Sequence, residues 1–155
     1  MTPQQLTLFA ALNSGSVEYL VVGGVAVNAY GYIRSTQDLD IFIRPTLENA
    51  QRAFAALQQL GLDLPGDASD LLVDYENLRF GSRPEQIDLL NSIGEMSFEH
   101  AWRNRVVVGV EDVDIAFISK ADLIENKLQV GHLRDLADVE ELQSRGDLDE
   151  IPDSL

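Results

Sequence analysis

The sequence contains no cysteine and few basic residues. The absence of cysteine excludes disulfides, thiolate zinc sites and cysteine nucleophiles. Eleven Lys and Arg residues against 26 Asp and Glu residues give a net charge of -15, which repels a polyanion unless the basic residues gather on one face. We therefore do not expect generic nucleic-acid binding. The charge favours a cationic small substrate or a protein partner with a basic face, although a solvated acidic surface that only maintains solubility explains it more simply.

The chain also lacks a long apolar stretch. No run approaches the roughly 20 apolar residues that a membrane span requires, and the first residues do not combine a basic region with an apolar core. We therefore expect no membrane association and a cytoplasmic location. Hydrophobic residues make up 45% of the 155 residues and charged residues 24%, as is typical of globular proteins. We predict a single domain over residues 1–155.

The hydrophobic pattern alternates between helical and strand periods along the whole chain. Capping signals support the first helix, at Thr2 and Pro3, and a later one, at Ser119. The patterns predict a loop over 62–74, helices over 2–15, 25–32, 47–60, 97–104, 119–130 and 134–144, and strands over 18–22, 38–43, 76–80, 86–91, 105–110 and 113–118. This order predicts an α/β or α+β fold in which helices flank a mixed β-sheet, with a C-terminal helical pair at about 119–145.

Asp38 and Asp40 are the residues that most directly suggest chemistry. Because successive strand residues point to opposite faces, both carboxylates should project from one face of the predicted strand 38–43, roughly 7 Å apart at Cα. Carboxylates this close repel each other unless a cation lies between them. Oxygen ligands of this kind suit Mg²⁺ or Mn²⁺, which often bind through carboxylates and the phosphates of a substrate. A solvent-facing strand edge is the simpler alternative.

Other residues gain weight from this acidic pair. Gly23 and Gly24 form a turn between a strand and a helix, where the backbone can approach a phosphate closely, although a plain tight turn explains them nearly as well. Arg34 and Thr36 carry groups that bind phosphate oxygens. Asp88 lies between apolar residues of the predicted strand 86–91 and is either a third ligand or an outward-facing side chain. Around Lys127 and Asp135, on the C-terminal helices, ordinary surface ion pairs are the simplest expectation.

The glycine pair, the acidic pair and the later aspartate together resemble the nucleotidyltransferase fold of the DNA polymerase β superfamily. The C-terminal residues from Ile118 to Leu128 and from Arg134 to Val139 look like the bacterial branch that includes the AbiEii-type toxins of toxin–antitoxin and phage-defence systems. Small relatives with this fold modify antibiotics, and the negative charge of this chain would suit a cationic acceptor.

This resemblance implies an Mg²⁺- or Mn²⁺-dependent transfer of an NMP group from an NTP to an acceptor hydroxyl on RNA, protein or a small molecule. The metal ligands would be Asp38, Asp40 and Asp88, which with Lys127 would form the catalytic set. The nucleotide would be held by Gly23, Gly24, Arg34, Thr36 and Asp135. A toxin or antitoxin would be the protein partner. The alternative is a non-catalytic antitoxin or protein-binding module that has kept the fold.

Overall fold

The computed structural model describes residues 1–74, 77–145 and 151. Its elements alternate much as the hydrophobic pattern predicts. The helices are α1 (Pro3–Ser14), α2 (Gly23–Ala29), α3 (Leu47–Gln59), η1 (Ala68–Leu72, a 3₁₀ helix), α4 (Phe98–Arg103), α5 (Lys120–Val130) and α6 (Leu133–Ser144), and the strands are β1 (Tyr19–Val22), β2 (Asp38–Ile43), β3 (Asn77–Phe80), β4 (Gln86–Leu90), β5 (Val106–Val110) and β6 (Val113–Phe117).

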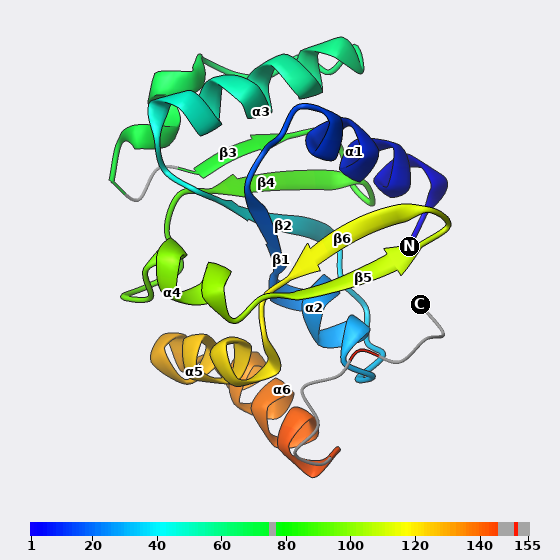
Figure 1. Ribbon diagram of the computed structural model, residues 1–155. Helices are drawn as coiled ribbons and strands as arrows, with labels where there is room; N and C mark the ends of the chain where they lie inside the picture. The colour runs from blue at the N-terminus through cyan, green and yellow to red at the C-terminus, as the bar shows by residue number, and fades with distance from the viewer. Residues whose placement is uncertain (75–76, 146–150, 152–155) are drawn as a thin grey trace.

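The strands form one six-stranded sheet in the order β3-β4-β2-β1-β6-β5. Strands β1 and β6, and likewise β2 and β4, pair in parallel, whereas the other neighbours are antiparallel. The prediction of a mixed sheet flanked by helices is therefore confirmed. In the view of Figure 1, α1 and α3 lie above the sheet, and α5 and α6 lie below it.

The core lies between the sheet and these helices. Fully buried aromatic and aliphatic side chains from α1 and the central strands fill it, among them Phe9, Phe42 and Ile41. Asn49 of α3 is one of the buried polar residues, at only 3% exposed. Its side chain bonds the backbone of Glu18 and Arg44, which fixes the start of α3 against the entry to β1 and the exit from β2.

Three local predictions differ from the structure. The glycine pair lies inside the first turn of α2 rather than before the helix, and α2 ends at Ala29, three residues earlier than predicted. The predicted loop over 62–74 contains the 3₁₀ helix η1, which a capping box at Asp67 stabilises. The predicted strand 76–80 begins at Asn77 among the described residues, and Glu76 lies outside them.

Within the described residues, no helix has the length and hydropathy needed to cross a membrane.

Candidate active site

Strand pairing brings three carboxylates together on one face of the sheet. Asp38 and Asp40 lie two residues apart on β2, and Asp40 is the direct partner of Asp88 on the parallel strand β4. Because residues opposite each other in neighbouring strands share a face, all three side chains project to the same side. The register of β2 and β4 therefore converts residues far apart in sequence into one acidic cluster.

Arg79 supplies positive charge to this cluster. It lies opposite Asp88 across the β3–β4 hairpin and holds that carboxylate with two hydrogen bonds, from Nε at 2.7 Å and from Nη2 at 2.8 Å. Its Nη2 also lies 3.9 Å from Asp38. Asp88 is only 6% exposed, so the alternative in which it simply faces solvent is wrong.

Within this cluster, the pKa of the Asp40 carboxyl is strongly raised. Burial, then the negative charges of Asp88 and Asp38, and then a hydrogen bond with the Asp88 carboxyl raise the pKa of Asp40 to about 7, and Arg79 offsets only part of this effect. Burial and like charges both disfavour an ionised carboxyl. A cation that contacts Asp40 would relieve this strain, so this aspartate is a suitable ligand for a divalent ion.

The glycine pair lets this cluster and the neighbouring loop approach the backbone. Gly23 has a φ of +65°, and a Cβ there would collide with the Asp40 carboxylate. At Gly24 a Cβ would lie 2.6 Å from Thr36 Oγ1 and 3.3 Å from Arg34 Nη1. The pair is therefore more than a plain turn, because side chains of the predicted site fill the space that a larger residue would need.

A buried ion network joins the same loop to the C-terminal helices. Arg34 donates to Asp138 from Nε at 2.7 Å and from Nη2 at 2.8 Å. Lys127 Nζ lies 2.9 Å from Asp138 and 3.2 Å from Asp135. Burial raises the pKa of Asp138, but hydrogen bonds from Arg34 and Lys127 outweigh it and hold that pKa below its ordinary value. Because Lys127 is buried and pairs with the buried Asp138, the expectation of ordinary surface ion pairs is wrong for Lys127.

A polar cavity of about 630 Å³ contains most of the residues discussed so far. Eight of the nine residues that the sequence singled out line it: Gly23, Gly24, Arg34, Thr36, Asp38, Asp40, Lys127 and Asp135. The ninth, Asp88, is the strand partner of Asp40, which lines the cavity. Arg83 and Arg134 also line this cavity. The acidic cluster and a set of cationic side chains thus share one space, as a metal–triphosphate complex would require.

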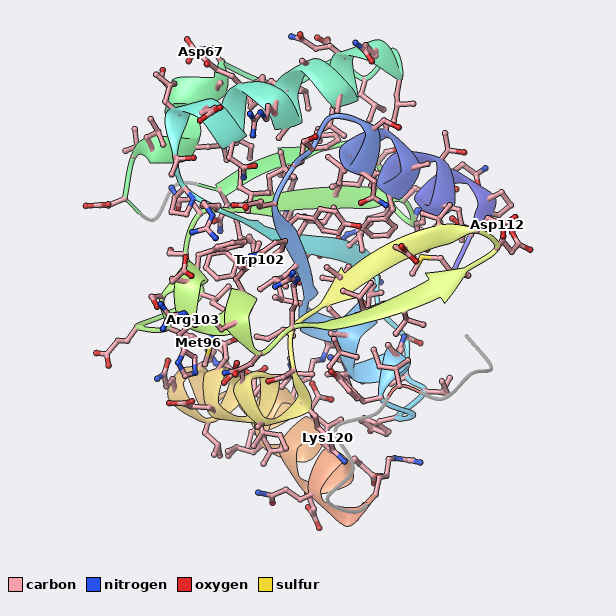
Figure 2. All side chains as sticks on the ribbon, in the orientation of Figure 1. Asp67, Met96, Trp102, Arg103, Asp112 and Lys120 are labelled. Carbon is pink, nitrogen blue, oxygen red and sulfur yellow. The ribbon has the colours of Figure 1, made fainter. Side chains whose placement is uncertain are left out.

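A basic patch for RNA would need arginines that gather on one surface. The four arginines from the β3–β4 hairpin and around α4 lie in two separate places. Arg79 and Arg83 belong to the β3–β4 hairpin and its turn. Arg103 pairs with Glu99 on α4, and the guanidinium of Arg105 lies 3.9 Å from the ring centroid of Trp102. Figure 2 labels Trp102 and Arg103 at α4, outside the strands that carry the aspartates. These four side chains do not make a continuous surface for RNA.

A second group of potential metal ligands lies on α4 and α5. One ligand atom from each of His100, Asp122 and Glu125 falls within 4.8 Å of the others. However, Asp122 already accepts a hydrogen bond from Asn104 and lies 3.0 Å from His100. We assign this group to the packing of α4 against α5.

Sequence reasoning missed Arg79 and Gln86. Gln86 is the partner of Asp38 in the β2–β4 pair, and its amide, with the nitrogen toward Asp38, satisfies Asp38 at 3.1 Å and Arg79 Nε at 2.7 Å. The predicted hairpin contained the signal for Arg79, since strands 76–80 and 86–91 in an antiparallel register bring Arg79 opposite Asp88. The contact of Gln86 with Asp38 could not be predicted in this way, because it depends on the parallel pairing of β2 with β4, which no local pattern shows.

The residues present fit a divalent metal ion. Asp38, Asp40 and Asp88 offer oxygen ligands of the kind that Mg²⁺ and Mn²⁺ bind. The guanidinium of Arg79 already pairs with Asp88, and burial together with the charges of Asp88 and Asp38 still raises the pKa of Asp40, which favours a further cation there.

Comparison with solved structures defines the class of protein. The fold is similar to the lincosamide antibiotic adenylyltransferase LnuA, solved with lincomycin bound, with a TM-score of 0.63 and 18% identity over 94% of this chain and 99% of that one. The antibiotic-resistance factor ANT(2'')-Ia gives 0.61 and 14% identity over 94% and 86%. A candidate nucleotidyltransferase from Thermotoga maritima gives 0.60 and 11% identity over 94% and 96%. The chain therefore has a nucleotidyltransferase fold.

The family follows from the sequence itself. Residues 4–151 match the family described as "Nucleotidyltransferase of unknown function (DUF6036)", and the chain belongs to that family. No protein with a curated description matches the sequence. The predicted nucleotidyltransferase fold is confirmed, and the family supports a transferase activity.

The raised pKa of Asp40 predicts a pH-dependent stability in protein stripped of metal with EDTA. Because the folded pKa of about 7 exceeds the ordinary value of 3.8, the stability from this group is fully present below about pH 4 and is lost as the pH rises through 7. Asp40→Asn cannot ionise, so at pH 8 it should be more stable than wild type by about 1–2 kcal/mol, or roughly 3–6 °C in Tm.

Thermal unfolding of both proteins between pH 4.5 and pH 8 checks this prediction, and the difference in Tm should shrink steadily toward the acid end. Asp112→Asn is the matched control. Asp112 is exposed at the turn between β5 and β6 (Figure 2), where an asparagine tolerates its φ of +68°. A constant difference in Tm at every pH would contradict the account.

Arg79 should stabilise the apo cluster and compete with a metal ion for it. Arg79→Gln removes the bidentate partner of buried Asp88, so the Tm without metal should fall by about 2–4 °C. The same change removes a positive charge from the ligands, so Mn²⁺ affinity should rise by about threefold or more. Calorimetric titration with Mn²⁺ measures the affinity. Weaker Mn²⁺ binding would show instead that Arg79 holds Asp88 in position for the metal.

Proposed function

We propose that this protein transfers an NMP group from an NTP to an acceptor hydroxyl in a reaction that depends on Mg²⁺ or Mn²⁺. The observation that carries this proposal is the shared polar cavity, in which Asp38 and Asp40 face the same space as Lys127 and Arg134. Carboxylates suit the metal, and the cations suit the phosphates of the nucleotide. The family and the fold support the transferase activity.

In this mechanism the chain positions the reactants and neutralises charge. Asp38, Asp40 and Asp88 would hold the divalent ion, which supplies charge stabilisation to the attacking and leaving oxygens of an in-line displacement. Gly23 and Gly24 let the phosphates approach the start of α2. Arg34 and Thr36 border the same space and would donate to phosphate oxygens.

The C-terminal helices would face the leaving pyrophosphate. Lys127 is fixed by Asp135 and Asp138, so its ammonium group is held in place before the nucleotide arrives and loses little side-chain entropy on binding. Arg134 is exposed on α6 and lines the same cavity. We assign to these cations the negative charge that develops on the pyrophosphate.

Asp88 is the residue that we propose takes the proton from the acceptor hydroxyl. It lies at the acidic edge of the cavity, opposite Asp40, and accepts two hydrogen bonds from Arg79. A shift of Arg79 away from this carboxylate would free it to receive the proton. The exposed position of Arg79 leaves the guanidinium room for that movement.

We also propose a toxin–antitoxin or phage-defence setting. Lys127 and Asp135, which lie in the segments that carry the AbiEii-type resemblance, line the polar cavity together with Arg34 and Thr36, which supports a common use of that site. A toxin or antitoxin would then be the protein partner. A non-catalytic antitoxin or binding module is the alternative, but such a protein would have no use for three clustered aspartates whose like charges repel one another.

The proposal predicts that Asp38→Asn and Asp40→Asn each lower NMP transfer by about 100-fold or more while the fold persists. The assay incubates the protein with Mg²⁺ and each α-labelled NTP in separate pools of RNA, protein and small molecules, and follows label transfer and pyrophosphate release. Circular dichroism checks that the variants are folded.

Asp112→Asn should retain full transfer, since this aspartate lies in an exposed turn away from the cavity. If wild type releases no pyrophosphate above the level of Asp40→Asn with any NTP or pool, the enzymatic proposal fails. The non-catalytic alternative would then replace it.

A further inference from the structure

A second cavity, of about 330 Å³, lies where α1 begins and α3 ends. Its apolar wall includes Val25 of α2, Leu39 of β2, Ile87 of β4, and Leu60 and Leu62 just after α3. Among these, Val25, Leu62 and Ile87 are only half-buried. The helix layer above the sheet thus leaves apolar surface uncovered at this point, which costs free energy in water and is typical of a small-molecule pocket.

The apolar cavity borders the candidate active site. Thr36, Gln37 and Asp38 line both cavities. Gln86 makes a second connection, because it lines the apolar cavity and its amide lies 3.1 Å from the Asp38 carboxylate. A ligand in the apolar cavity would therefore end beside a proposed metal ligand.

Apart from that shared segment, the two cavities are lined by different residues: α5 and α6 contribute to the polar cavity, and α1 to the apolar one. Helices α5 and α6, which carry Lys127 and Arg134, lie below the sheet in Figure 1, whereas α1 and α3 lie above it. In-line displacement requires the attacking oxygen and the leaving pyrophosphate to lie on opposite sides of the α-phosphorus. If the pyrophosphate faces Lys127 and Arg134, an acceptor held in the apolar cavity would reach the phosphorus past Asp38, away from those two cations.

The lining of the cavity restricts the chemistry of its ligand. The described residues that line it include two carboxylates, Asp38 and Glu85, but no lysine or arginine. The start of α1 adds little positive potential, because Pro3 has no N–H and the Gln5 N–H already binds Thr2. A neutral or cationic group is therefore favoured over an anion. The volume suits a small molecule rather than a macromolecule.

We propose that the apolar cavity binds the acceptor, and that the acceptor is a small molecule with an apolar body, a hydroxyl group and a neutral or positive charge. This inference rests on the proposed function and names its substrate class. The acceptor oxygen forms a bond to the α-phosphorus, and the bond from that phosphorus to the bridging oxygen of pyrophosphate breaks. Pyrophosphate leaves with the electron pair, and the hydroxyl proton passes to the acidic cluster, whose Asp38 borders this cavity.

A matched pair of probes tests the cavity by binding. 6-Aminohexan-1-ol carries a hydroxyl, an apolar chain and an ammonium group, and 6-hydroxyhexanoate differs by ending in a carboxylate. In ¹⁵N–¹H spectra, 6-aminohexan-1-ol should shift the backbone amides of Leu8, Val25 and Ile87. The carboxylate analogue should bind at least about tenfold more weakly. The absence of saturable shifts at these amides would overturn the inference, as would tighter binding of the anion.

Two matched variants test the location. Leu60 lines the cavity and is 37% exposed, whereas Leu72 of η1 lies outside it and is 38% exposed. Leu60→Trp should fill the cavity and abolish probe binding, while Leu72→Trp should leave it unchanged. Thr7→Trp, at an exposed lining position of α1, provides a second block if Leu60→Trp does not fold. Equal probe binding by wild type and both blocked variants would overturn the location.

Mn²⁺ tests the proximity of this cavity to the metal ligands. With Mn²⁺ added, the protons on the hydroxyl-bearing carbon of 6-aminohexan-1-ol should relax faster than those beside the amine. The effect should disappear in Asp38→Asn, which lacks a proposed metal ligand. Equal relaxation at both ends of the bound probe would contradict delivery of a hydroxyl to the metal.

The transfer assay separates failure of this inference from failure of the proposed function. In the small-molecule pool, Leu60→Trp should lower NMP transfer by about tenfold or more through a raised acceptor KM, with the Kd for NTP unchanged. Transfer equal to wild type would overturn the acceptor cavity and leave the nucleotidyltransferase proposal intact. Wild type without transfer or pyrophosphate release in any pool would remove the proposed function, and the acceptor role with it.

Discussion

Mutual repulsion of three carboxylates is the constraint on which the rest of the site depends. The parallel pairing of β2 and β4 leaves Asp40 directly opposite Asp88, with Asp38 two residues away on the same face. No local rearrangement can separate these groups, because their spacing is set by the backbone hydrogen bonds of the sheet. The guanidinium of Arg79 offsets part of this charge, and burial together with the charges of Asp88 and Asp38 still raises the pKa of Asp40.

A second electrostatic element fixes the loop that precedes the acidic pair. Arg34 reaches the buried carboxylate of Asp138, which also binds Lys127. Removal of one partner from such a buried network leaves an uncompensated charge. The loop from Arg34 to Asp38 is thereby tied to α5 and α6. The C-terminal helices consequently do more than cover the sheet, since they anchor Arg34, one of the proposed nucleotide-binding residues.

Local patterns predicted most of the fold, because each element carries its own period and caps. The strand 38–43 was predicted with its observed bounds, and the shared face of Asp38 and Asp40 follows from strand geometry alone. The contacts of the glycine pair could not be predicted in this way. Thr36 fits against Gly24 only because the chain returns over the start of α2, a long-range arrangement without a local signal.

Buried charge was the least predictable feature. By sequence pattern, Lys127 and Asp138 are ordinary helix residues like the exposed charges around them, yet tertiary packing buries both. The Arg79–Asp88 pair could be derived from the hairpin register, but its place beside Asp38 depends on the order of β3, β4 and β2 in the sheet. Sequence therefore identifies which residues carry the chemistry more readily than it identifies what compensates their charge.

The most direct test of the account is a crystal structure with Mn²⁺ and an NTP analogue whose α,β-bridging oxygen is replaced by a methylene group. The account predicts anomalous density for manganese between the carboxylates of Asp38 and Asp40, with the β- and γ-phosphates directed toward Lys127 and Arg134. Manganese bound instead at His100, Asp122 and Glu125, with the nucleotide absent from the polar cavity, would contradict it.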